Sequence, residues 1–253
     1  MMFLLYLYMF VVGSVLGSFY NVVGLRVPEK MSIITPRSHC PVCHRTLTAT
    51  DLIPVFSYIF LRGKCRGCGS RISPIYPAIE LGTGLLFMLA LYQFGFSLEL
   101  IVALTFISLL VIIFVSDIAY MLIPDKVLLF FLPLFVLERI FIPLEPWWDP
   151  LLGGVSGFLL LLLIAVISNG GMGGGDIKLY LLIGIVLGFK LTILSFFIAV
   201  LIGAVYGIGG MLIGKHKKRQ PIPFGPFIAI GALCAYFYGE NIFAWYITTF
   251  LTF

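Results

Sequence analysis

Long stretches without a charged residue are the feature that most constrains how this chain can fold. The first charged residue is Arg26, and further uncharged runs cover 81–98, 100–116, 150–175 and 191–214. A helix that crosses a bilayer needs about 20 apolar residues, and each of these runs approaches or exceeds that length. Only 11% of the 253 residues are charged and 61% are hydrophobic, which leaves too few charges to coat a water-soluble domain. The sequence therefore predicts an all-α polytopic membrane protein.

The positions of the sixteen Lys and Arg residues predict how the chain is oriented in the membrane. Eight of them lie in residues 26–71 and four in the run 215–219, while Lys126 and Lys178 stand alone beside apolar stretches. Basic residues favour cytoplasmic loops. We therefore expect the N-terminus outside and four cytoplasmic segments: 26–78, 118–126, 170–178 and 215–221. The opposite connections contain Glu99, Glu145, Asp149 and Glu240, with Trp147 and Trp148 as an interfacial anchor.

These assignments predict about eight transmembrane helices. Their expected ranges are 1–25, 79–95, 99–117, 125–143, 151–169, 176–189, 191–214 and 222–239. The sixth and seventh helices are expected to form a hairpin around residues 188–190, because segments 170–178 and 215–219 are both expected on the cytoplasmic side. The tail 241–253 either extends the last helix or lies at the outer interface. Three domains follow: a first helix (1–25), a cytoplasmic loop (26–78) and a transmembrane bundle (79–253).

Four of the five cysteines lie in the long cytoplasmic loop. Cys40 and Cys43 form one CxxC motif, Cys65 and Cys68 form another, and 21 residues separate them. Two such knuckles supply the four soft ligands that tetrahedral zinc needs. Disulfides are rare in the cytoplasm, and a redox motif would use a single CxxC in a different context. The pattern predicts a structural zinc site.

Other residues near the cysteines have plainer interpretations. His39 and His44 flank the first knuckle and could replace a cysteine ligand, but four cysteines suffice, so exposed loop positions are expected for both. Cys234 lies in an apolar helix, where packing is the expected role. The eight basic residues of the loop oppose only Glu29 and Asp51. Topology and contact with anionic lipid explain that excess. The alternative is a basic surface beside a site that receives a charged partner.

Three aspartates are expected at the cytoplasmic membrane face. Asp117 ends the third predicted helix, Asp125 opens the fourth and Asp176 opens the sixth. Ionisable groups at membrane depth are costly and are candidates for function. Asp125 follows Pro124 and resembles an ordinary first-turn acid. Asp117 is the hardest to explain structurally, because the C-terminal end of a helix repels negative charge.

A glycine-rich segment precedes Asp176. Five of the six residues 170–175 are glycine, including Gly173, Gly174 and Gly175. An N-cap role would explain Asp176 alone, but so many glycines indicate a backbone that approaches another group closely. Two carboxylates brought together share a proton, so one can activate water as a base while the other polarises a carbonyl. That is the chemistry of an aspartic protease.

The ordered set of these motifs resembles the type IV prepilin peptidases, over residues 13 to about 230. Gly173-Gly-Gly-Asp176 fits the GxGD motif of intramembrane-type aspartic proteases, and Asp117 with Ile123-Pro-Asp125 fits the partner motif. The two knuckles, the run from Asp51 to Glu80, Ser18-Phe-Tyr-Asn21 and Pro223-Phe-Gly-Pro226 also resemble segments of that family.

The resemblance implies a peptidase that removes the short basic leader of type IV prepilins and pilin-like proteins at the cytoplasmic membrane face. It assigns the catalytic pair to Asp117 and Asp176, with Asp125 as a possible supporting acid. It also implies N-methylation of the new amino terminus with S-adenosyl-L-methionine, for which residues 26–78 are the candidate region. No nucleic acid partner is expected.

Three alternatives remain beside the peptidase. A presenilin-like protease would carry a Tyr-Asp partner motif and a Pro-Ala-Leu segment, which are missing at the corresponding positions. An ion-coupled transporter using intramembrane aspartates would place them near the midplane and often shows internal repeats. A zinc-bearing membrane scaffold would leave the glycine run unexplained. Pairs of glycines four residues apart, at 13/17, 153/157 and 203/207, predict close helix packing within one bundle.

Overall fold

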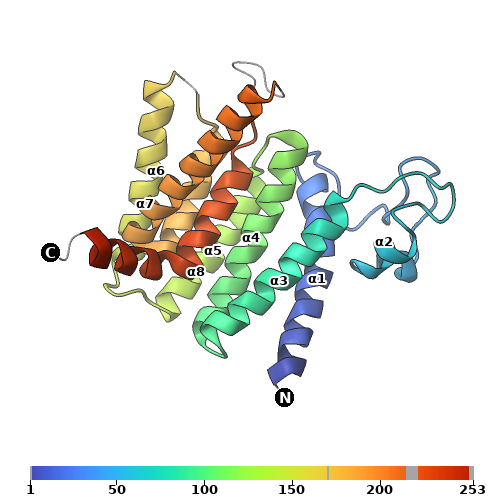
Figure 1. Ribbon diagram of the computed structural model, residues 1–253, viewed down its shortest axis with the longest axis horizontal. Coiled ribbons are helices and arrows are strands. Elements are labelled where there is room, and N and C mark those ends of the chain that lie inside the picture. Colours follow the sequence, from blue (N-terminus) through green and yellow to red (C-terminus); the bar gives the residue numbers. More distant parts are fainter. Residues whose placement is uncertain (1, 170, 215–221, 251–253) are drawn as a thin grey trace. The chain divides into compact units, whose positions relative to one another are not determined.

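The structure, a computed structural model, describes residues 2–169, 171–214 and 222–250, and its regular elements there are helices (Figure 1). In chain order they are α1 (Met2–Arg26), η1 (Ala49–Leu52), α2 (Phe56–Phe60), α3 (Ile75–Phe94), α4 (Leu98–Tyr120), α5 (Asp125–Phe141), α6 (Asp149–Ile167), α7 (Gly174–Leu212) and α8 (Gly225–Phe250). Six of them, α1, α3, α4, α6, α7 and α8, are long and apolar enough to cross a membrane. The predicted all-α polytopic membrane fold is confirmed.

Helix α7 contains the hairpin predicted between the sixth and seventh segments. At Gly188 the backbone leaves helical geometry, with φ 76° and ψ 176°. The hydroxyl oxygens of Tyr180 and Ser195 are 3.4 Å apart, whereas 15 residues of straight helix would separate them by about 22 Å along the axis. The two arms of α7 therefore run antiparallel. With α7 counted as two segments, all eight predicted helical segments are present, but α5, with 17 residues, is not among the described helices that are long and apolar enough to cross a membrane.

Glycine pairs bring helices into close contact. A Cβ atom at Gly13 would lie 2.9 Å from the Cα of Gly84, so α1 and α3 touch backbone to backbone. A Cβ at Gly157 would lie 2.7 Å from the carbonyl oxygen of Tyr180, where α6 meets the first arm of α7. At Gly203 the nearest atoms are 3.4 Å away, which is an ordinary contact. The predicted packing role is confirmed for the first two pairs.

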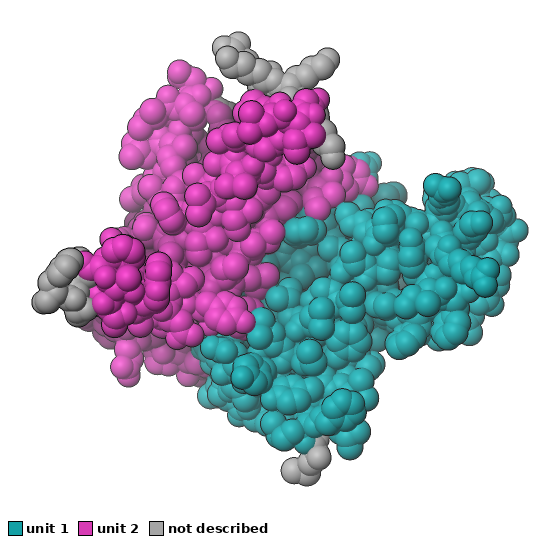
Figure 2. All heavy atoms as spheres, viewed as in Figure 1, with its two compact units in different colours: residues 1–115 teal, residues 116–253 magenta. Residues whose placement is uncertain are grey.

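The chain divides into two compact units, residues 1–115 and 116–253, coloured separately in Figure 2. Unit 1 contains α1, the cysteine loop, α3 and most of α4. Within it the Tyr20 hydroxyl bonds to the Ser108 hydroxyl at 2.5 Å and links α1 to α4. Unit 2 contains the end of α4 and helices α5 to α8, and its helix α7 packs against α5, α6 and α8.

One end of unit 2 surrounds the Gly188 turn. Two nitrogens of the Arg139 guanidinium donate to the carbonyl oxygen of Val186 at 3.1 and 2.6 Å, and the backbone N–H of Phe189 donates to Asp149 at 3.1 Å. The end of the first arm and the start of the second arm thus each hydrogen-bond to a charged side chain. Arg139 and Lys190 are the two basic residues outside the predicted cytoplasmic segments. The structure gives both a local role, because Lys190 pairs with Glu240 at 2.8 Å.

Two further expectations concern the last part of the chain. Helix α8 continues to Phe250, well beyond the predicted end at residue 239, so residues 241–250 of the tail extend the last helix. The basic run 215–219, on which part of the predicted orientation depends, lies outside the described residues.

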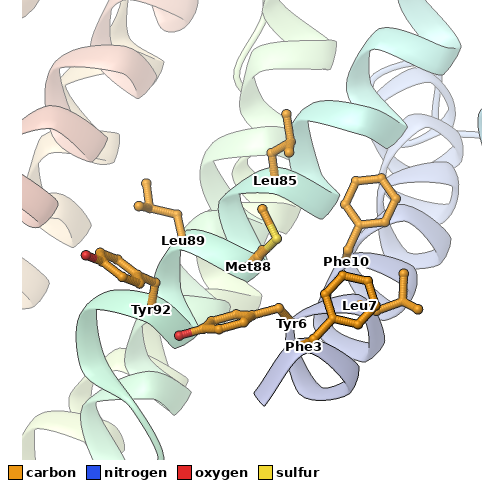
Figure 3. Close-up of a pocket in the computed structure, with 8 residues that line it drawn as sticks. All are labelled: Phe3, Tyr6, Leu7, Phe10, Leu85, Met88, Leu89 and Tyr92. Atoms are coloured by element: carbon orange, nitrogen blue, oxygen red, sulfur yellow. The ribbon is translucent and has the colours of Figure 1, made fainter. Parts of the chain in front are cut away.

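An apolar groove lies between α1 and α3 in unit 1, with a volume of about 570 Å³ (Figure 3). None of the predicted site residues lines it, and tyrosine hydroxyls are the only polar side-chain groups in its wall. The lining residues are Phe3, Tyr6, Leu7, Phe10, Leu85, Met88, Leu89 and Tyr92.

Candidate active site and metal centre

Asp117 is buried in the last turn of α4, with 5% of its surface exposed. Its carboxylate accepts a hydrogen bond of 2.7 Å from the backbone N–H of Gly225, the first residue of α8. The helix α8 therefore directs the positive end of its dipole towards Asp117, which offsets the unfavourable position of an acid near the end of α4. A Cβ at residue 225 would lie 2.8 Å from Oδ2 of Asp117, so this approach requires glycine.

Asp176 is the third residue of α7, directly after the glycine run. A Cβ at Gly173 would lie 2.9 Å from Oδ2 of Asp176, and one at Gly175 would lie 2.7 Å from Cβ of Ile123. At Gly174 a Cβ would meet no described atom within 4 Å. The expectation that these glycines permit a close backbone approach is confirmed at two of the three positions. Gly170, also part of the run, lies outside the described residues.

The fold of unit 2 brings Asp117 and Asp176 together from two different helices. They lie close enough for the charge of Asp117 to act on the Asp176 carboxyl. The carboxyl of Asp176 is held over the Gly173 backbone, and that of Asp117 is held by Gly225. Two carboxyl groups whose charges interact can act as a pair on one water molecule, one as the base and the other as the acid.

Asp125 has a different environment from the other two aspartates. It is the first residue of α5, follows Pro124, and keeps 59% of its side chain exposed. Both of its carboxylate oxygens accept hydrogen bonds of 2.8 Å from the Lys178 ammonium on α7. The structure thus gives Asp125 a first-turn position and an ion pair that joins α5 to α7.

The four cysteine sulfurs of the loop converge on one point. All four Sγ atoms lie within 4.8 Å of one another, with Cys40 and Cys68 at 3.8 Å and Cys43 and Cys65 at 4.0 Å. Tetrahedral zinc with Zn–S bonds of about 2.3 Å would place its sulfur ligands about 3.8 Å apart. The donor set and the spacing therefore fit a zinc ion, as the sequence predicts.

The two knuckles repeat the same backbone pattern. The N–H of Cys40 donates to the carbonyl of Arg45, and the N–H of Cys65 donates to that of Ser70. Four residues after the first cysteine of each knuckle, the chain takes a positive φ, 56° at His44 and 71° at Gly69. His44 thus occupies the turn position that Gly69 fills in the second knuckle. His39 and His44 are both exposed, as expected.

Hydrogen bonds prepare the sulfur of Cys40 to bind a metal. The backbone N–H of Cys43, the Ser70 hydroxyl and the backbone N–H of Val42 hydrogen-bond to the Cys40 sulfur and lower its pKa to about 5. A thiolate is the form of cysteine that binds metal. These contacts therefore favour the thiolate at Cys40.

Asp51 ties the two knuckles together. Its side chain accepts hydrogen bonds from the backbone N–H of Thr48 at 3.1 Å and from the Arg45 guanidinium at 2.8 Å, and it pairs with Arg66 at 3.2 Å. Arg45 follows the first knuckle, and Arg66 lies inside the second. The bond from the Thr48 backbone, its hydroxyl group and the two arginines together hold the pKa of Asp51 below its usual value.

Sequence reasoning missed the roles of Gly225 and Asp51. Gly225 appeared only as part of Pro223-Phe-Gly-Pro226. Asp51 appeared as one of two acids in a basic loop and as the start of a run that resembles the family, without a role of its own. The usable signals were a glycine directly before Pro226 at a helix start and the scarcity of acids in the loop. Neither signal identifies the partner residue, because it is the fold that brings Asp117 to Gly225 and Arg66 to Asp51.

Comparison with known proteins gives matches along most of the chain. The Bacterial Peptidase A24 N-terminal domain family matches residues 11–94, and the Type IV leader peptidase family matches residues 104–208. A Bacillus subtilis (strain 168) protein named prepilin leader peptidase/N-methyltransferase is 53% identical over 239 residues, which cover 94% of this chain and 96% of that protein.

More distant relatives carry the same name. A protein of Aeromonas salmonicida (strain A449) is 32% identical over 96% of this chain and 94% of its own length. One of Aeromonas hydrophila is 33% identical over 96% of this chain and 93% of its own length. No solved structure matches the chain.

Proposed function

This chain belongs to the type IV leader peptidase family, and we propose that it removes the leader of type IV prepilins and pilin-like proteins with Asp117 and Asp176 as the catalytic pair. The observation that carries the assignment is the meeting of these two carboxyl groups, one from α4 and one from the start of α7. Asp125, exposed and paired with Lys178, serves as a supporting acid that holds α5 against α7.

The chemistry requires only the two aspartates and water. One carboxylate accepts a proton from the water that attacks the scissile carbonyl carbon, while the other, protonated, polarises the carbonyl oxygen. The C–N bond then breaks, and a proton passes to the leaving amine. Gly225 and Gly173 fix the two carboxyl groups, so that these side chains lose little conformational freedom when the substrate binds. A substrate anchored in the same membrane needs to search only along its surface.

The proposed topology places this site at the cytoplasmic face and the N-terminus outside, because the basic segments follow the positive-inside rule. Residues 1–25 then form a first transmembrane helix, 26–78 a cytoplasmic domain and 79–253 the peptidase bundle. The cysteine cluster of the loop holds zinc as a structural ion. Its spacing and donor set support this assignment.

A second activity, N-methylation of the new amino terminus, is proposed from the names of the relatives. S-adenosyl-L-methionine would supply the methyl group. Residues 26–78 are the candidate region, because they form the one segment with many polar side chains beside the apolar helices. The other function considered for the buried aspartates, ion transport, has no support from the relatives.

The test combines purified protein with a prepilin and follows the leader and the N-terminal mass by mass spectrometry. Asp117→Asn and Asp176→Asn should each reduce cleavage about 100-fold or more, since each removes one member of the acid–base pair. Asp125→Asn is the matched control and should cleave at a rate much closer to that of the wild type. Loss of cleavage in Asp125→Asn, with Asp117→Asn active, would contradict the assignment.

A further inference from the structure

Residues 52–60 of the cytoplasmic loop expose a run of apolar side chains. They cover η1's last residue, a turn and the five-residue helix α2. Phe60 alone is 81% exposed. The exposed members of this segment are Leu52, Ile53, Phe56, Ile59 and Phe60. Apolar side chains at such a density are unusual in a loop that faces water.

A strained turn fixes the segment to α3. Val55 has φ 63° and ψ −52°, and the N–H of Phe56 donates to the carbonyl of Pro54 at 2.6 Å, which together define a γ-turn. Positive φ is costly for a β-branched residue. The turn is held by the N–H of Val55, which donates to the carboxylate of Glu80 at 2.7 Å, and Glu80 is itself buried.

The Glu80 contact sets the depth of the segment in the membrane. Glu80 is the sixth residue of α3, about 8 Å along the helix from its start. All 20 residues of α3 are needed to reach about 30 Å, the thickness of the hydrocarbon layer. Val55 is therefore held beside the first turns of a spanning helix, and Figure 1 shows α2 alongside these turns.

The charges next to the segment suit an anionic surface. Arg62 and Lys64 follow α2 directly; both are exposed, and neither forms an ion pair within the described part of the chain. Asp51, the nearest acid along the sequence, is already bound by Arg45 and Arg66. Amphipathic segments with apolar and basic residues of this kind bind the interface of anionic bilayers.

We propose that residues 52–60 lie in the lipid–water interface, with Phe56, Ile59 and Phe60 among the acyl chains and with Arg62 and Lys64 on anionic headgroups. Glu80 is the positioning residue that anchors the segment to α3. This inference does not depend on the assignment of the catalytic aspartates.

Site-specific photocrosslinking tests the proposal on the full-length protein. The photoreactive amino acid p-benzoylphenylalanine replaces Phe60 in one variant and Phe56 in a second, in nanodiscs of phosphatidylcholine with or without phosphatidylglycerol. Val42, 65% exposed at the tip of the first knuckle, is the matched control. Mass spectrometry of the irradiated protein measures lipid adducts, and metal content verifies that the loop is folded.

Positions 60 and 56 should form lipid adducts, and position 42 should form few. The share of phosphatidylglycerol among the adducts should fall towards its share in the bilayer in Arg62→Gln and in Lys64→Gln, because each substitution removes a charge that attracts anionic headgroups. Adducts at positions 60 and 56 no more frequent than at position 42 would overturn the proposal. Adducts to protein in place of lipid at both positions would overturn it too, and would show that a protein surface covers this face.

Discussion

The three candidate aspartates differ in what surrounds each side chain. Asp117 is buried against the first residue of α8, Asp176 lies over a glycine, and Asp125 is exposed against a lysine. A buried carboxylate without a partner is strongly destabilising. The Gly225 N–H and the start of α8 therefore make the position of Asp117 tolerable while leaving its second oxygen for another interaction.

Substitution of two neighbouring glycines should have opposite effects. Gly175→Ala places a methyl group against Ile123 and should lower the free energy of unfolding by about 1–3 kcal/mol, as overpacking does, while moving Asp176. Gly174→Ala meets no described neighbour and adds helix propensity, so its thermal stability should match or exceed that of the wild type. Thermal unfolding in detergent compares them. Equal losses in both variants would contradict the geometry at Ile123.

Asp51 should make the stability of the cysteine loop depend on pH in acid. Its pKa is lower in the folded loop than in the unfolded chain. The contribution is complete above the ordinary aspartate pKa of about 3.9 and is lost as the pH falls through the lower folded value. Amide hydrogen exchange of the loop in wild type and Asp51→Asn should therefore differ at pH 7 and converge below about pH 4. A difference that persists unchanged in acid would refute the role.

Among the elements, α7 determines the geometry of the candidate active site. Its first arm begins at the Asp176 loop and ends at Gly188, where the chain reverses. The carbonyl end of that arm is bound by Arg139 of α5, and the start of the second arm by Asp149 of α6. The arm that carries Asp176 is thus bound by α5 near both ends, through Asp125 at Lys178 and through Arg139 at Val186.

Removal of the Arg139 guanidinium should loosen this hairpin. Arg139→Met leaves the carbonyl of Val186 without its donors and should cost about 1–3 kcal/mol, the usual penalty for a buried polar group left unsatisfied. Lys190→Met is the control at the same end of the unit, because the exposed Lys190–Glu240 pair is worth about 0–1 kcal/mol. Both are measured by thermal unfolding. A larger loss in Lys190→Met would reverse our ranking of the two contacts.

At the scale of the whole molecule, the cysteine cluster and the two candidate catalytic aspartates belong to different compact units. The cysteine cluster lies in residues 1–115, and Asp117, Asp176 and Gly225 lie in residues 116–253. Most helix contacts of unit 2 are made by α7 with α6 and α8. Its packing therefore does not depend on the sulfur cluster.

Paired replacement of Cys65 and Cys68 by serine should separate the two proposed activities. The variant should lose one zinc ion per chain and the order of the loop, since metal binding supplies folding energy to such small modules. Methylation should fall more than leader removal. His44→Gly, outside the ligand set, should keep its metal. Metal analysis and the N-terminal mass of one substrate report on all three properties. Equal loss of both activities at normal protein levels would show that the loop shapes a shared substrate site.

Local patterns in the sequence were sufficient to predict the helices and the cysteine cluster. Charge-free runs locate the helices because burial in lipid depends on the composition of each segment alone. The eight predicted segments are present, including the turn at Gly188. The four sulfurs meet as expected, because a CxxC turn presents two ligands whatever its surroundings. The ends of α3, α4 and α8 were less predictable, since a helix continues past a charged residue when a neighbouring element supplies a partner.

The tertiary structure alone decided which groups meet. Nothing near Asp117 in the sequence indicates Gly225, and nothing near Asp51 indicates Arg66, because these contacts join segments separated by whole helices. Arg139 and Lys190 do not follow the pattern that places basic residues in cytoplasmic segments. The fold explains both, because it places Val186 beside Arg139 and Glu240 beside Lys190. The sequence by itself determined the membrane helices, the sulfur ligands and the three candidate acids. Packing then set the partners of those acids, because hydrogen bonds and charge interactions act over a few ångströms in space and not along the chain.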